Sequence, residues 1–195
     1  MKIQSDEKRP WFDMHILDTS DIGSAVAGLG ALKPGYVIVF GNQHHLSMAD
    51  IGPTDRNDFI EYSLTVAQRV EHLTGGPVVV AEHGSSKQDG TSCINHVHLQ
   101  LIPSQLKTLD LSTWNSASSL ADLPFDRLAG TSYLMALREG TAFYRNASVE
   151  DRRFFRRAFA EDQGVPHEDD YIVWPRLASV RTTIDQWARS GAGVS

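Results

Sequence analysis

The sequence is short of cysteine and of long apolar runs, and each shortage excludes a class of protein. Cys93 is the only cysteine among 195 residues, so no disulfide can form within the chain and we expect a reducing compartment. No apolar run approaches the length that crosses a bilayer, and residues 1–10 lack the apolar stretch of a secretory signal. We therefore expect no membrane partner and a cytoplasmic location.

Positive charge is also scarce, since 18 Lys and Arg residues face 24 Asp and Glu residues and the net charge is −6. This balance argues against a nucleic-acid partner held by its phosphate backbone, yet it allows one phosphate-bearing ligand in a locally positive cleft. The 41% hydrophobic and 22% charged content is ordinary for a globular protein, and the length fits one domain with an extension.

Residues 96–103 carry a strict alternation of polar and apolar side chains, which predicts a β-strand with one buried face. Alternate residues of a strand point the same way, so His96, His98 and Gln100 are expected to line one face. Pro103 lacks a backbone N–H and ends the strand. Neutral imidazole can act as nucleophile, base or ligand near pH 7, and a carboxamide can donate a hydrogen bond without carrying charge. The strand is therefore the candidate site.

The segments before this strand predict an α+β fold around an antiparallel sheet. Residues 36–40 are a continuous apolar run, and residues 77–84 are an apolar run that ends in polar groups; both indicate buried strands. Between them, residues 53–55 predict the start of a helix that Thr54 or Asp55 can cap, and residues 56–74 place apolar side chains at helical spacing.

The C-terminal half is less periodic. It predicts a loop with a short helix over 104–130, a hairpin over 132–137 and 141–145, a helix through 163 opened by the Ser148–Asp151 capping pair, and a last helix near 182–189. We divide the chain into an N-terminal arm (1–22), a catalytic core (23–104) and an α/β extension packed on the same domain (105–195).

Three sequence features together resemble the histidine-triad (HIT) superfamily of nucleotide hydrolases and transferases. They are the approach Glu82-His83-Gly84, the loop over 90–95, and the pattern His-x-His-x-Gln followed by an Ile-Pro pair. The mark of the family is His-φ-His-φ-His-φ-φ, in which φ is hydrophobic, and Gln100 replaces the third histidine here. This variant is similar to the transferase and phosphorylase branches, such as galactose-1-phosphate uridylyltransferase and diadenosine tetraphosphate phosphorylase. The resemblance covers about residues 30–103.

The resemblance implies a HIT-like antiparallel sheet with the long helix packed on it, a nucleotide substrate, no cofactor and a homodimer. It implies that His98 attacks the α-phosphorus and forms a covalent nucleotidyl-histidine, that His96 orients the surroundings of His98, and that His44 lies beside the nucleotide. A carboxamide can hold the phosphoryl oxygen but cannot deliver a proton. Gln100 therefore favours transfer or phosphorolysis over release to water.

The candidate nucleotide contacts are Asn42, Gln88, Ser92 and Asn95. The loop over 85–92 is rich in hydroxyls and glycine, a composition that can present backbone N–H groups to a phosphate and is equally that of a solvated turn. Asn42 and Gln43 stand where family members often carry Lys or Arg, which leaves open how phosphates are held.

Three other interpretations compete with nucleotidyl transfer. The first is hydrolysis of a nucleotide phosphoramidate or dinucleoside polyphosphate, and the second is a nucleotide-binding module without turnover. The third is a metal protein, for which we expect no site, although the side chains that could serve are His44, His45, Glu82, His83, Cys93, His96 and His98.

Overall fold

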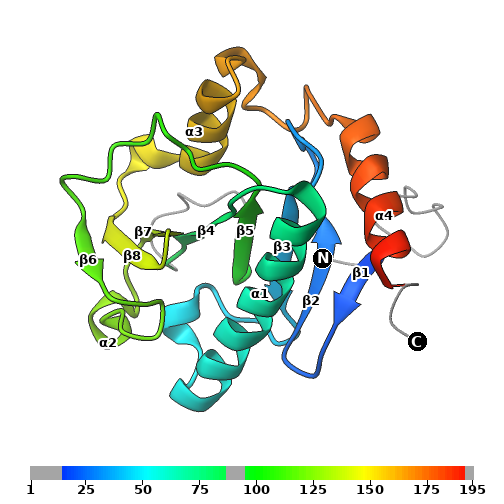
Figure 1. The fold of residues 1–195 in the computed structure, drawn as a ribbon. Helices are drawn as coiled ribbons and strands as arrows, with labels where there is room; N and C mark the ends of the chain where they lie inside the picture. The colour runs from blue at the N-terminus through cyan, green and yellow to red at the C-terminus, as the bar shows by residue number, and fades with distance from the viewer. Residues whose placement is uncertain (1–14, 87–94, 192–195) are drawn as a thin grey trace, which may run out of the picture.

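Eight strands pair antiparallel into one sheet in the computed structural model, which describes residues 15–86 and 95–191 (Figure 1). The strands are β1 (Ile16–Thr19), β2 (Gly23–Ala27), β3 (Val37–Gly41), β4 (Val79–Gly84), β5 (His98–Ile102), β6 (Asn115–Ala117), β7 (Tyr133–Arg138) and β8 (Thr141–Asn146). The helices are η2 (Met48–Asp50), α1 (Pro53–Thr74), α2 (Phe125–Leu128), η3 (Val149–Asp151), α3 (Phe154–Asp162), η4 (Pro166–Glu168) and α4 (Leu177–Gly191). The α+β fold class is therefore confirmed.

The strand order β1-β2-β3-β5-β4-β7-β8-β6 places the motif strand β5 in the middle of the sheet, between β3 and β4. The arm supplies β1 at one edge, and the extension supplies β7, β8 and β6 at the other. All three parts of the chain thus share one sheet, and our division into arm, core and extension stays a prediction. No helix in the described part of the chain is both long and apolar enough to cross a membrane.

Helix α1 covers one face of the sheet (Figure 1). Alternate strand residues such as Val39 of β3 and Leu99 of β5 are buried against the apolar side of α1, which includes Phe59 and Val66. The helix begins differently from our expectation. Pro53 occupies the first helical turn behind Gly52, and no side chain caps the N-terminus, so the capping role predicted for Thr54 or Asp55 is wrong.

Helix α3 covers part of the opposite face, where Phe155 and Phe159 pack on Val79 and Ala81 of β4. Helix α4 lies along the β1 edge in Figure 1. This second face carries apolar residues at the end of β5 that contains Ile102, whereas His98 stands at its other end. One end of this sheet face is therefore packed with apolar side chains, and the candidate site lies at the other end.

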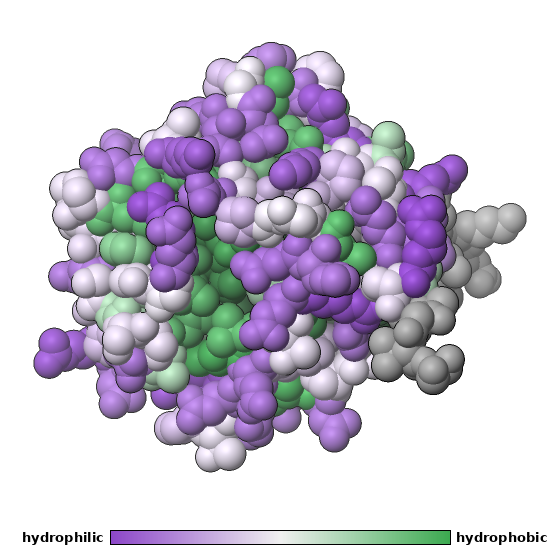
Figure 2. All heavy atoms as spheres, viewed as in Figure 1, coloured by the Kyte–Doolittle hydropathy of each residue, from purple (hydrophilic) through white to green (hydrophobic). Residues whose placement is uncertain are grey.

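Apolar side chains reach the surface on the α1 face where the sheet continues beyond the helix. Figure 2 shows them gathered between α1 and the β6–α2 segment. Leu137 of β7 and Tyr144 of β8 are partly buried residues that pack against the α1 core from this region. The outer strands of the extension are thus covered less completely than the central ones.

Several predicted boundaries are corrected by the structure. The motif strand begins at His98, and His96 lies in a bend before it. Three residues of the region predicted as loop and short helix form β6, which pairs with β8. The Ser148–Asp151 capping box forms as predicted but opens η3, because Arg153 adopts a left-handed conformation (φ 60°) before α3 begins. The last helix starts at Leu177, five residues earlier than predicted.

A buried carboxyl group ties the loop after β3 to the sheet. Glu82 is 1% exposed on the α1 face of β4, where one carboxyl oxygen accepts a hydrogen bond from the Met48 backbone N–H (2.8 Å) and the other accepts one from the Tyr133 hydroxyl (2.5 Å). Burial raises the pKa of Glu82 from its ordinary value of 4.5 to about 7, although both hydrogen bonds act to lower it. The loop that carries His44 is therefore anchored at its far end.

The raised pKa of Glu82 predicts a pH-dependent contribution to stability. Because the folded state binds this proton more tightly, the contribution is fully present below about pH 4.5 and is lost as the pH rises to about 7. The free energy of unfolding of the wild type, relative to Glu82→Gln, should fall by about 2–3 kcal/mol between pH 5 and pH 8. Urea unfolding at both pH values measures this difference. Glu61→Gln, an exposed carboxylate on α1, is the matched control and should show no such change.

Candidate active site

The ring of His98 is held in one tautomer by the backbone. Nδ1 of His98 lies 2.8 Å from the carbonyl oxygen of His96. A carbonyl oxygen only accepts hydrogen bonds, so Nδ1 carries the proton and Nε2 keeps its lone pair. Burial lowers the pKa of His98 below its ordinary 6.5, which outweighs the backbone hydrogen bond. At pH 7 the ring is therefore neutral, with Nε2 available as a nucleophile.

His96 and His44 form a second hydrogen-bonded unit beside His98. Nε2 of His96 lies 2.6 Å from the carbonyl oxygen of Gly41, so this nitrogen is the donor and Nδ1 is left to accept. Nδ1 of His44 lies 3.1 Å from Nδ1 of His96, and the two ring centres are 5.3 Å apart. In the neutral rings the His44 Nδ1–H donates, which leaves Nε2 of exposed His44 free to meet a ligand.

The position of His96 follows from the end of β3. The Gly41 backbone N–H donates to the Val97 carbonyl oxygen (3.2 Å), and the Val97 N–H donates to the His45 carbonyl oxygen (2.7 Å). Both backbone polar groups of Val97, the residue between His96 and His98, are therefore hydrogen-bonded. The His96 ring lies edge-on to Phe40, 6.3 Å away, and Phe40 stands opposite His98 in the β3–β5 ladder. His96 therefore reaches the His98 face from outside the strand.

Gln100 has its amide orientation set by Tyr36, a residue that sequence reasoning did not single out. The Tyr36 hydroxyl donates to Oε1 of Gln100 at 2.9 Å. The carbonyl side of the amide is thus occupied, and its NH₂ group remains able to donate. The Tyr36 ring is held by the extension, because Phe159 lies 5.8 Å from it and the Arg156 guanidinium 5.6 Å. The apolar run that follows Tyr36 in the sequence was its only signal.

Of the four predicted nucleotide contacts, Asn42 and Asn95 lie among the described residues, and their side chains make different hydrogen bonds. Asn42 donates to the carbonyl oxygens of Ser20 (2.8 Å) and Asp21 (3.2 Å) and accepts from the Ser24 hydroxyl, so its amide holds the β1–β2 turn. Asn95 is exposed, and its Oδ1 accepts a hydrogen bond from Ser85 at 3.4 Å. Gln88 and Ser92 lie outside the described residues.

Two further groups adjoin the site without having been predicted to act there. His83 of β4 is buried, and burial lowers its pKa from 6.5 to about 4, with smaller effects from nearby charges that include His98. The Arg145–Asp151 ion pair (2.6 Å) adds charges that also act on His83. The sequence signal for His83 was the polar pair that ends an apolar strand, and Asp151 was predicted only as the acid of a capping pair. Across the described ranges, no group of three His, Cys, Asp or Glu side chains is placed to hold a metal ion, and Cys93 lies outside them.

Two solved structures are similar to part of the chain. A hypothetical histidine triad nucleotide-binding protein from Sulfolobus tokodaii strain7 is 12% identical over 46% of this chain and 59% of its own, with a TM-score of 0.41. A Hit-like protein involved in cell-cycle regulation from Bartonella henselae is 18% identical over 45% and 64%, with a TM-score of 0.40. The chain thus spans less than two thirds of either. No protein-family model and no curated protein sequence matches it.

The tautomer of His98 can be read directly from its ring nitrogens. In protein labelled with ¹⁵N-histidine, the His98 ring should show a protonated Nδ1 and an unprotonated Nε2 at pH 7, and its midpoint should lie below 6.5. His98→Asn, whose side-chain amide can still donate to the His96 carbonyl, identifies the signals. A protonated Nε2 would show that the carbonyl contact does not fix the ring, and a midpoint at or above 6.5 would show that burial does not dominate the pKa of His98.

Proposed function

We propose that the protein is an enzyme of the histidine-triad type, which transfers a nucleotidyl group through a covalent intermediate on His98. Its substrate class would be a nucleoside di- or polyphosphate, and its acceptor a phosphate or phosphate ester. The observation that carries the proposal is the 2.8 Å contact between Nδ1 of His98 and the His96 carbonyl oxygen, because it leaves a neutral nucleophilic nitrogen on the sheet face.

The first step suits a neutral nucleophile. Phosphate oxyanions repel an incoming anion, whereas Nε2 of His98 can approach the α-phosphorus without charge. The N–P bond forms as the bond to the leaving oxygen breaks, and that oxygen keeps the electron pair. The Nδ1 proton stays on the ring, so the nucleotidyl-imidazole becomes cationic, and the His96 carbonyl oxygen accepts a stronger hydrogen bond as it does so.

Gln100 supports transfer rather than hydrolysis. Its NH₂ group is free to donate to a phosphoryl oxygen, because Tyr36 already occupies the amide oxygen. A carboxamide has no proton to give to a leaving group or to take from water. The intermediate is then stabilised while its hydrolysis is not accelerated, so a second phosphate-bearing compound has time to attack. His44, with Nε2 exposed, is the partner proposed for the nucleotide side.

Hydrolysis of a phosphoramidate or dinucleoside polyphosphate shares the first step and differs only in the acceptor. A binding module would hold nucleotide without the covalent step. The nucleotide contacts Asn42, Gln88, Ser92 and Asn95, the homodimer and the cytoplasmic location remain predictions that belong to the same proposal. The covalent step separates transfer from the binding module, and the acceptor of the nucleotidyl group separates transfer from hydrolysis through the same intermediate.

Intact mass after brief mixing with a panel of nucleoside diphosphate compounds tests the covalent step. The wild type should gain the mass of one nucleoside monophosphate, and His98→Asn should gain none. His72→Asn, at an exposed position in the last turn of α1, is the matched control and should react like the wild type. Consumption of nucleotide without an adduct points to direct hydrolysis, and binding without either points to the module; each result would contradict transfer.

Replacing Gln100 with histidine tests why the intermediate persists. In Gln100→His the new imidazole can exchange protons, so release of the adduct to water should accelerate about a hundredfold, the lower end of general acid–base contributions. The fraction passed to added inorganic phosphate should fall in proportion. Gln163→His, on the surface after α3, controls for an added histidine. An unchanged partition between water and phosphate would remove Gln100 from the explanation.

A further inference from the structure

His83 of β4 stands opposite His98 of β5 at a point where the two strands are no longer hydrogen-bonded to each other. Strands β4 and β5 pair as far as Ala81 and Gln100, and continuing this register by two residues sets His83 opposite His98. The paired ladder stops at Ala81, although β4 runs on to Gly84. Both imidazoles belong to the same sheet face, since alternate residues share a face. The register therefore places the two imidazoles opposite each other on one face, where the strands are not paired.

The His83 side chain is buried without a hydrogen bond. It is 7% exposed, and its Nε2 atom has no partner among the described residues. Leaving a buried polar atom unsatisfied costs its full desolvation penalty, so such atoms are rare and need a physical explanation. Packing alone gives none, because an apolar side chain would fill the same space at no such cost. A ligand that completes the hydrogen bonding of His83 does.

Burial leaves His83 neutral in the free protein. Burial lowers its pKa from 6.5 to about 4, the charge of Asp151 opposes this, and the charges of His98 and Arg145 add to it. An incoming phosphate would act in the same direction as Asp151, because a nearby anion favours the imidazolium form. Binding of a multiply charged anion can therefore shift this ring toward protonation at neutral pH.

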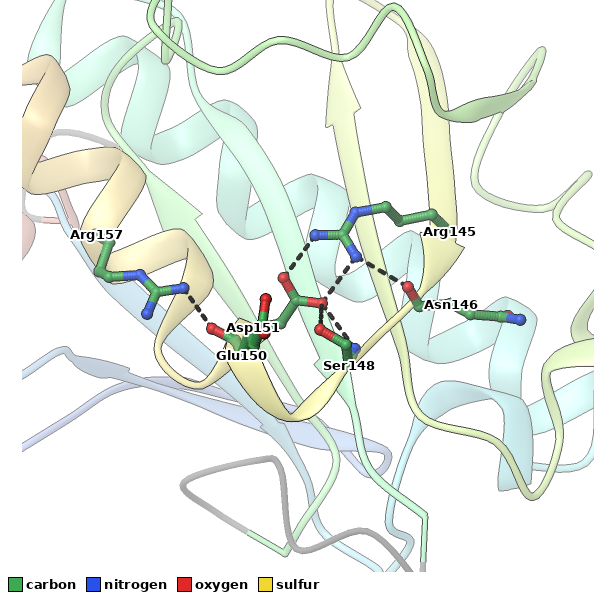
Figure 3. A network of polar contacts seen from close by, with 6 residues as sticks. All are labelled: Arg145, Asn146, Ser148, Glu150, Asp151 and Arg157. Carbon is green, nitrogen blue, oxygen red and sulfur yellow. Dashed lines mark hydrogen bonds and ion pairs between the residues drawn. The ribbon is translucent and has the colours of Figure 1, made fainter.

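The carboxylate of Asp151 is fixed in place by the extension (Figure 3). Two nitrogens of the Arg145 guanidinium donate to its two oxygens at 2.8 and 2.6 Å, and the Ser148 backbone N–H donates at 2.7 Å. These contacts hold the pKa of Asp151 at about 2 despite its burial, so the group stays charged. A permanent negative charge therefore acts on His83 from η3, a segment outside the predicted catalytic core.

We propose that His83 is a second phosphate contact of the His98 site, on the leaving-group side, where it takes up a proton as substrate binds and gives it to the departing oxygen. The sheet order β3-β5-β4 supports this side, because His96 and His44 approach His98 from the β3 flank and His83 from the β4 flank. The inference rests on the proposed function and adds the residue that protonates the product.

The protons and electrons balance in the proposed attack of His98 on the substrate. Nε2 of His98 forms the bond to phosphorus, the bridging P–O bond breaks, and its electron pair stays on the oxygen of the leaving phosphate. His83, protonated from solvent on binding, transfers that proton to the same oxygen and returns to the neutral ring. Transfer of the nucleotidyl group to an acceptor then regenerates His98. No oxidant, reductant or metal enters the balance.

Calorimetric titration with methylene-bridged nucleoside diphosphates of four bases, which bind but cannot be cleaved at the bridge, tests the inference. Repeating the titration in buffers with different ionisation enthalpies gives the number of protons taken up. At pH 7, His83→Asn should take up about one proton fewer than the wild type. His72→Asn, the exposed control on α1, should match the wild type.

The outcomes separate this inference from the proposed function. Equal proton uptake in the wild type and His83→Asn overturns the role of His83, while adduct formation by the wild type leaves the proposed function intact. Absence of binding by every analogue contradicts both. If His83→Asn does not fold, ¹⁵N-histidine spectra of the wild type replace it: the His83 ring should change from neutral to imidazolium when the analogue is added, and an unchanged ring overturns the inference.

Discussion

The hydrogen bond from Nδ1 of His98 to the carbonyl oxygen of His96 is the interaction on which the chemistry of this sheet face depends. It is made between residues two apart in the sequence, so it needs only that the chain straighten into β5 directly after His96. That requirement is met because both backbone polar groups of Val97 are hydrogen-bonded, its carbonyl oxygen to Gly41 and its N–H to His45. A local backbone geometry thus decides which nitrogen of His98 keeps its lone pair.

The extension beyond residue 104 contributes to the site as well as to the sheet. Its helix α3 packs on Tyr36, which orients Gln100, and its segment η3 carries Asp151, whose charge acts on His83. These two contacts reach the candidate site at different points, one beside Gln100 and the other beyond β4. The candidate site and the extension are therefore coupled by packing and by charge.

The sequence predicted the site strand because its alternation has a period of two, and it predicted α1 because apolar residues recur at helical spacing over residues 56–74. It missed β6, whose three residues Asn115–Ala117 have no apolar alternation and form a strand only by pairing with β8. For a related reason it did not place Tyr36 beside Gln100 or His83 beside His98. Their positions beside Gln100 and His98 follow from strand order and register, which local pattern does not contain.

The identity of the atom that carries the intermediate tests the central claim most directly. Protein labelled with ¹⁵N-histidine, reacted with a nucleoside diphosphate compound and examined for ³¹P–¹⁵N coupling, reports which nitrogen is bonded to phosphorus. The geometry predicts Nε2 of His98, because Nδ1 is committed to the His96 carbonyl oxygen. Phosphorus on Nδ1 of His98, or on His44, His96 or His83, would contradict the assignment of His98 Nε2 as the nucleophile.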